Sequence, residues 1–145
     1  MDRKDNVVTL SDLSWDEKYL IGHEKIDSEH MLFFDLMKSI ERHFREGGDK
    51  KIISGLLDEL RRYADFHFCS EENIMYEIGY SGLADQRTMH RNLLTDLDIL
   101  INQYKEDDIA PPLIIGFLFN WFLGHSSVED RKIQKFIEQT KANLA

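Results

Sequence analysis

Apolar residues recur at helical spacing along four stretches of the chain, and glycine or proline stands between the stretches. Gly47 and Gly48 follow the first stretch, and glycine suits the left-handed cap that ends a helix. Pro111 and Pro112 lie at the start of the last stretch, where a helix tolerates proline in its first turn. The predicted helices cover residues 24–45, 52–75, 83–104 and about 112–142.

Four long helices joined by short connections favour an antiparallel up-down-up-down four-helix bundle. No stretch alternates between apolar and polar residues over a useful length, so the fold class is predicted to be all-α. Residues 1–22 are predicted to form an extended N-terminal arm, in which Trp15 and Tyr19 are spaced to pack onto the bundle. We therefore expect residues 1–145 to form a single domain, with the bundle over residues 23–142.

The composition narrows the range of partners. An apolar content of 42% with 11% aromatic residues is typical of a packed globular protein, and the net charge of −9 argues against nucleic-acid binding. Apolar runs fall short of the roughly 20 residues that a membrane helix needs, and the N-terminus lacks the apolar core of a secretion signal. The single cysteine, Cys69, cannot form an internal disulfide. We expect a cytoplasmic protein with no nucleic-acid and no membrane partner.

Histidine and carboxylate residues lie on the apolar faces of the predicted helices. His67 and Glu71 are four residues apart, so one face of a helix can aim both side chains at a common centre. A buried glutamate is costly unless it is paired or bound to a metal. A single pair of this kind is common on helix surfaces, so the argument depends on the whole set, whose mixed chemistry suits iron. The candidate metal ligands are His30, His67, Glu71, His90, His125 and Asp130.

Asp130 has the least comfortable spacing of the set, because it follows His125 by five residues. On an ideal α-helix, such a pair points about 140° apart. The two side chains could still bracket two ions, and a local helix irregularity, as found at functional sites, would help. Six groups from four helices are enough to hold a buried pair of metal ions.

Four segments of the chain resemble the bacterial hemerythrin family: residues 26–30 (I-D-S-E-H), 67–71 (H-F-C-S-E), 86–90 and 121–130 (W-F-L-G-H-S-S-V-E-D). Trp15 and the intervening lengths also match, so the resemblance covers nearly the whole chain. Hemerythrins hold two non-haem irons that share one glutamate, one aspartate and a bridging oxo or hydroxo group. The resemblance implies one iron with an open position for dioxygen on His30 and His67, bridges from Glu71 and Asp130, and a second iron on His90, His125 and residue 86.

Position 86 departs from the family pattern, because it is glutamine where the family has a histidine. Gln86 could supply its amide oxygen to the metal, or the position could be filled by water or stay vacant beside the other ligands. An amide is a weaker donor than imidazole, so ferrous iron is expected to be held less firmly, with an exchangeable position on each iron. A complete di-iron centre is preferred to a site for one metal or zinc, and an empty bundle is the least favoured outcome.

The pocket beside the metals is expected to include Phe122 and Ser126. The family often carries a bulky aliphatic residue directly after the fourth-helix histidine, and Ser126 takes that place here. A hydroxyl would admit water, which promotes the loss of bound dioxygen as peroxide from oxidised iron. The hypothesis is that this centre autoxidises readily.

Three functions are compatible with this pattern. The preferred one is a protein that binds dioxygen or a related small ligand for carriage, storage or delivery. A sensor would instead present its iron state to a signalling partner, and a di-iron enzyme would react with peroxide or nitric oxide. A binding protein is favoured over an enzyme, and its further partner would be an unidentified signalling or electron-donor protein.

Overall fold

The computed structural model describes residues 15–144, without the side chains of Pro111, Leu123, Ser126, Ser127 and Leu144. All regular elements in this range are helical, which confirms the all-α prediction, and none of these helices combines the length and apolarity needed to cross a membrane. A short turn, η3 (Glu17–Tyr19), precedes α1 (Glu24–Arg45), α2 (Lys50–Ile78) and α3 (Leu83–Lys105). The fourth rod consists of α4 (Pro111–Trp121), a π-helical turn η4 (Phe122–Ser127) and α5 (Val128–Leu144).

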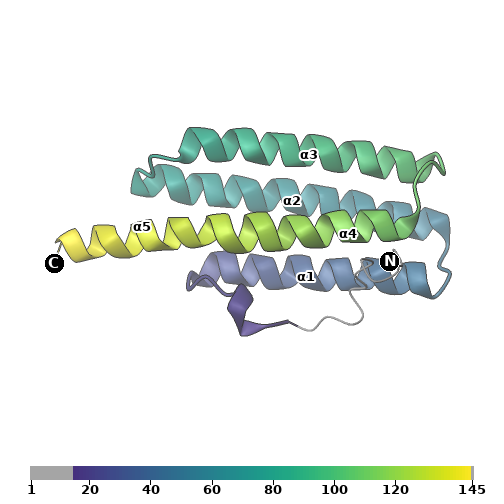
Figure 1. Cartoon of the computed structure of the whole chain (residues 1–145), viewed down its shortest axis with the longest axis horizontal. Coiled ribbons are helices and arrows are strands. Elements are labelled where there is room, and N and C mark those ends of the chain that lie inside the picture. The colour runs from purple at the N-terminus through teal and green to yellow at the C-terminus, as the bar shows by residue number, and fades with distance from the viewer. Residues whose placement is uncertain (1–14, 145) are drawn as a thin grey trace, which may run out of the picture.

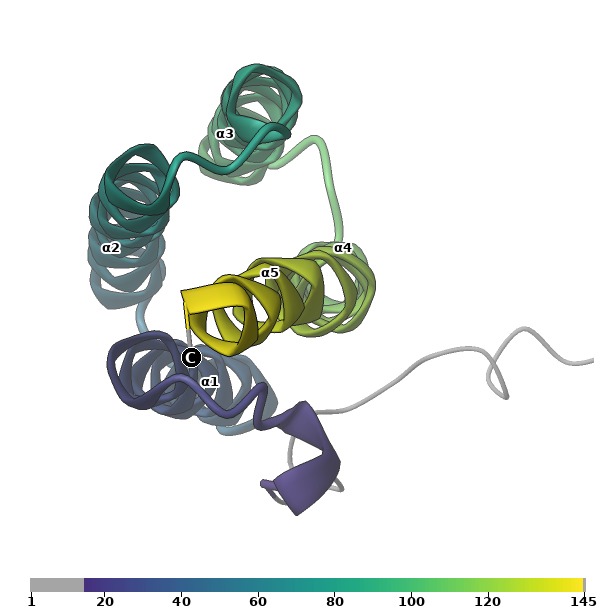
Figure 2. The ribbon, with the colours of Figure 1, turned by 90° about the vertical axis from the view of Figure 1, so that its left-hand side faces the viewer.

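The rods run alternately in opposite directions and lie side by side (Figure 1). α2 contacts α1 and α3, and α4 contacts both α1 and α3, so the four rods enclose one interior. Seen from the end, they form a ring in which α5 continues α4 (Figure 2). This arrangement is the predicted antiparallel four-helix bundle.

Local chemistry places the helix ends close to the predicted positions. Asp49 precedes α2 and accepts a hydrogen bond from the backbone N–H of Lys51. Gly79 ends the same helix in the left-handed region, at φ 70°, where a side chain would be strained. The two prolines occupy the first positions of α4, as expected.

Aromatic rings fill the core where the arm meets the bundle. Phe34 and Phe122 are almost completely buried, and Tyr19 of η3 packs on both rings. Trp15 lies edge-on to Tyr19, Phe34 and Phe122, with ring centroids 5.4, 5.7 and 6.3 Å away. The expected packing of Trp15 and Tyr19 onto the bundle is confirmed, whereas residues 1–14 of the predicted arm lie outside the described residues.

The fourth rod differs from the uninterrupted helix predicted over residues 112–142, because its middle turn is π-helical. In a π turn the backbone N–H bonds five residues back instead of four, so one extra residue is taken into the turn. The turn contains His125 and ends shortly before Asp130. It is the kind of irregularity that the spacing of these two residues suggested.

Candidate metal centre

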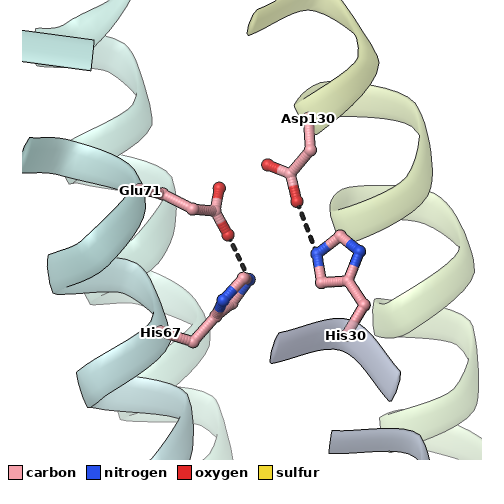
Figure 3. A group of neighbouring side chains, drawn as sticks. All are labelled: His30, His67, Glu71 and Asp130. Carbon is pink, nitrogen blue, oxygen red and sulfur yellow. Dashed lines mark ion pairs between the residues drawn. The ribbon is translucent and has the colours of Figure 1, made fainter. Parts of the chain in front are cut away.

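Two groups of histidine and carboxylate side chains lie inside the bundle. Within each group, the candidate ligand atoms all lie within 4.8 Å of one another. Glu71 belongs to both groups, so its carboxylate stands between two places where a cation would fit. The groups are His30, His67, Glu71 and Asp130 (Figure 3), and Glu71, His90 and His125, and all six side chains are buried.

All four rods contribute to these groups. In chain order, the side chains come from α1 (His30), α2 (His67 and Glu71), α3 (His90), η4 (His125) and α5 (Asp130). The extra residue in η4 explains how His125 and Asp130 both lie within reach of Glu71 despite their spacing of five. The structure thus brings together all six residues that the sequence singled out.

Glu29 of α1 orients the His67 ring from behind. Its Oε1 accepts a hydrogen bond from His67 Nδ1 at 2.7 Å, and its Oε2 accepts one from Ser70 Oγ at 2.9 Å. The Tyr63 hydroxyl donates to the backbone carbonyl of Glu29 at 2.7 Å, which also fixes this part of α1 against α2. Because an ionised carboxylate can only accept, Nδ1 of His67 carries a proton and Nε2 is the atom directed at the centre.

His90 is oriented in the same way by Glu72 of α2. Glu72 Oε2 accepts from His90 Nδ1 at 2.8 Å, and its Oε1 accepts from Arg87 Nε at 3.3 Å. Phe68 stacks flat on the His90 ring, with centroids 4.0 Å apart and planes at 8°. Ring position and tautomer of His90 are therefore both set by its neighbours.

Sequence reasoning missed Glu29 and Glu72. Each directly adjoins a predicted ligand in the sequence, as Glu29–His30 and Glu71–Glu72. An acidic residue next to a candidate ligand was the available signal, but each carboxylate orients a histidine on a different helix. Only the packing of α1 on α2, and of α2 on α3, reveals these partners.

The atoms that a metal would take have no hydrogen-bond partner among the described residues. Nε2 of His30 forms an ion-pair contact with Oδ2 of Asp130 at 2.8 Å, and His67 forms one with Glu71 (Figure 3), but these atoms make no hydrogen bond with the described residues. A buried polar atom without a partner costs about 1–3 kcal/mol, so a cluster of them points to a bound cation. Among the described residues, the unpartnered buried atoms include Nε2 of His30, His67, His90 and His125 and both carboxylate oxygens of Glu71 and Asp130.

Residues 21–137 match the family of the Hemerythrin HHE cation binding domain. The chain belongs to the hemerythrin family. Members of this family are di-iron, oxygen-binding proteins, and a pair of iron ions is the cofactor that the two groups around Glu71 accommodate. The resemblance read from the sequence is confirmed.

Bacteriohemerythrins and a myohemerythrin align with this chain over most of their length. A bacteriohemerythrin of Clostridium acetobutylicum is 26% identical over 125 residues, which cover 81% of this chain and 95% of that protein. A bacteriohemerythrin of Campylobacter jejuni is 25% identical, with 88% and 97% covered. A myohemerythrin of Theromyzon tessulatum is 26% identical, with 81% and 88% covered. The similarity therefore extends across the bundle and is not confined to the ligand segments.

The protonation of the histidines follows from their surroundings. Burial, reinforced by the nearby His67, lowers the pKa of His30 to about 3, and burial lowers the pKa of His125 to about 4. Both rings are therefore neutral at physiological pH and can donate a lone pair to a metal. Burial alone would also lower the pKa of His67, but Glu71 and Glu29 together raise it to about 9. A metal that binds His67 at neutral pH must displace a proton.

The two central carboxyl groups shift in opposite directions. Burial and the charge of Glu71 raise the pKa of Asp130 well above its usual value. Burial alone would raise the pKa of Glu71 too, but the charge of the adjacent His67 lowers it below its usual range. Two buried carboxyl groups this close ionise together only when positive charge lies beside them, which a pair of cations supplies.

Gln86 is also buried in this region. It lies one helical turn before His90, on the same face of α3. Its Nε2 donates to Glu129 Oε2 at 3.4 Å, and its Oε1 is buried without a partner from the described residues. The arrangement keeps the amide oxygen free for another interaction.

The predicted pocket residues have different outcomes. Phe122 is completely buried and packs against His30, with ring centroids 5.5 Å apart. It therefore lies on the His30 side of the centre, and its role in a ligand pocket stays a prediction. Ser126 belongs to η4, but its side chain lies outside the described residues, so its predicted role stays a prediction.

Proposed function

We propose that this protein binds dioxygen at its di-iron centre for carriage, storage or delivery. The observation that supports this most strongly is the pair of ligand groups that share the carboxylate of Glu71. We assign His30 and His67 to one iron, His90 and His125 to the other, and Glu71 and Asp130 as bridges between them. When bound, the irons supply the reducing electrons and the open coordination position that dioxygen binding requires.

The surroundings of His30 and His67 suit the iron that would keep an open position. Phe122 packs against His30 and excludes water from that side of the ring. Glu29 holds His67 by its Nδ1 and so keeps Nε2 directed at the metal. A dry wall with few polar groups favours a small neutral ligand over water.

The experiment that tests this function is stopped-flow mixing of the reduced, iron-loaded protein with dioxygen. We expect a visible absorption band that appears on mixing and decreases when dioxygen is removed. Azide added to the oxidised protein should give its own azide-to-iron charge-transfer band. An iron-loaded protein without a dioxygen-dependent band would refute the proposal, and sustained catalytic consumption of peroxide would favour the enzyme instead.

We further propose that the centre oxidises readily in air. The amide of Gln86 is a weaker donor than the family's imidazole, so the second iron should be held less firmly. A surface hollow of about 310 Å³ borders His125 and brings solvent close to this side of the centre. The Gln86→His variant should keep its dioxygen-dependent band longer than the wild type. A wild-type band that survives for hours in air would contradict this proposal.

The cellular setting of this function is also a proposal. We place the protein, as one domain over its 145 residues, in the cytoplasm, where the exposed and unpaired Cys69 suits a reducing environment. Ferric iron must be reduced before it binds dioxygen again, so we infer an electron-donor protein as a partner. A pull-down that depends on the oxidation state of the iron would identify such a donor or a signalling partner. Capture that is the same in both states would argue against either role.

A further inference from the structure

We propose that Gln86 is a ligand of the second iron through its amide oxygen, and that Glu129 determines which end of the amide faces the metal. This assignment rests on the di-iron centre proposed above. The amide oxygen, rather than water or a vacant position, would then complete the ligands of this iron.

The first support is the position of Gln86. Gln86 is 3% exposed and lies on the face of α3 that carries His90 one turn later. A glutamine is rarely buried so completely unless both ends of its amide are satisfied. One end meets Glu129, and the other end, Oε1, has no partner among the described residues.

Glu129 supplies the second support, because it determines which end of the Gln86 amide is the nitrogen and which is the oxygen. The oxygen and nitrogen of a glutamine amide are assigned from their partners, and an ionised carboxylate only accepts hydrogen bonds. Gln86 must therefore present its N–H group to Glu129, as it does at 3.4 Å. If the amide turned round, its oxygen would face a second acceptor at a buried position. The oxygen is consequently left at the inner end.

Glu129 is not itself a ligand. Its carboxylate is not among the groups that converge with His90 and His125. Its side chain is 23% exposed, and Lys132 lies 3.1 Å from Oε2 and balances its charge. Glu129 therefore acts on the metal through Gln86, as a positioning residue.

The chemistry of this site follows from a neutral oxygen donor beside two imidazoles. Iron accepts oxygen and nitrogen ligands together, so an amide oxygen completes the set without adding charge. The donor is weaker than imidazole, so the second metal should bind less tightly than with histidine at position 86. It should still bind more tightly than with an apolar residue there.

The test is a titration of the full metal-free chain with Co²⁺, which reports both affinity and, by its visible bands, coordination. Gln86→Leu removes the oxygen and should lower the affinity for the second metal by about 10–100-fold, with the first metal unaffected. Glu129→Ala leaves Gln86 in place but free to turn, and should cause a loss of the same kind. Glu129→Gln can still accept from the Gln86 amide and should recover most of that loss.

A matched control lies on α5, the helix that also carries Glu129. Gln134 Nε2 donates to Glu138 Oε1 at 3.4 Å, a contact like that of Gln86 but exposed. Glu138→Ala should therefore leave both metal affinities at their wild-type values. Because Glu129 is partly exposed, the fold should survive its replacement, and circular dichroism of each variant checks this.

A double variant separates an indirect role of Glu129 from an independent one. If Glu129 acts only through Gln86, then Gln86→Leu with Glu129→Ala should lose no more affinity than Gln86→Leu alone. Losses that add, or a Gln86→Leu variant that binds two metals like the wild type, would overturn the assignment while the di-iron centre stands. A wild-type chain that takes up only one metal would overturn both.

Discussion

Replacing Glu29 by alanine removes the acceptor of two buried donors at once. His67 Nδ1 and Ser70 Oγ, at 2.7 and 2.9 Å from the carboxylate, would be left without it. Each buried donor left without a partner costs about 1–3 kcal/mol, so the free energy of unfolding should fall by about 2–6 kcal/mol. The backbone contact from Tyr63 to Glu29 is unchanged, because it uses the carbonyl oxygen.

The same change should weaken the metal site. Without Glu29, the His67 ring can turn and its tautomer is no longer fixed, which typically costs about 10–100-fold in metal affinity. Glu29 is also one of the groups that raise the pKa of His67, so its loss makes the competing proton easier to displace. Burial and Glu71 have larger effects on that pKa, so this gain should be smaller than the loss of orientation.

Two further variants separate the contributions of charge and hydrogen bonding. Glu29→Gln keeps an oxygen for His67 and loses the charge, whereas Ser70→Ala removes one hydrogen bond and keeps the carboxylate. We expect the loss of metal affinity to decrease from Glu29→Ala to Glu29→Gln to Ser70→Ala. Urea denaturation and a metal titration against a competing chelator measure the two quantities. Equal metal affinity in Glu29→Ala and wild type would refute the proposed role of Glu29.

Three other outcomes are expected. Phe122→Ala leaves a cavity at a fully buried position beside the centre, and urea denaturation should show the free energy of unfolding lowered by about 3–5 kcal/mol. A loss below about 1 kcal/mol would be inconsistent with the packing of Phe122. The pKa of His67 is raised to about 9, so its ring is protonated at lower pH and metal binding releases that proton, to which Asp130 can add a second. The apparent metal affinity should therefore rise by about tenfold or more per pH unit from pH 6 to 8, and a flat profile by calorimetry would contradict this. Glu72→Ala should lower the affinity for the second metal about 10–100-fold, because His90 loses its hydrogen-bond acceptor. Arg87→Ala, which removes a half-exposed ion pair with Glu72, should change metal affinity little, and equal effects of the two variants would argue against orientation of His90 by Glu72.

The sequence was sufficient for the fold because helical periodicity and the breaks between stripes are local properties. The predicted first helix, residues 24–45, has the observed bounds, and the other stripes lie within a few residues of α2, α3 and the fourth rod. The six candidate ligands could also be found, because a histidine or carboxylate on an apolar helix face is conspicuous. The family resemblance then placed them in two groups.

Other features depend on packing between helices and could not be found from the sequence. The geometry of the π turn at His125 follows from backbone hydrogen bonds, and only an awkward spacing hinted at it. Glu29 and Glu72 look like ordinary surface charges in the sequence until the facing helix brings a histidine to each. The contact between Gln86 and Glu129 joins residues 43 positions apart, on α3 and α5. Contacts over such distances are set by the register between rods.

Anomalous diffraction at the iron edge, from crystals of the iron-loaded wild-type chain, locates the irons directly. Two peaks are expected inside the bundle, one beside His30 and His67 and the other beside His90 and His125, with the carboxylate of Glu71 between them. A single peak, or iron bound only at the surface, would contradict a shared di-iron centre.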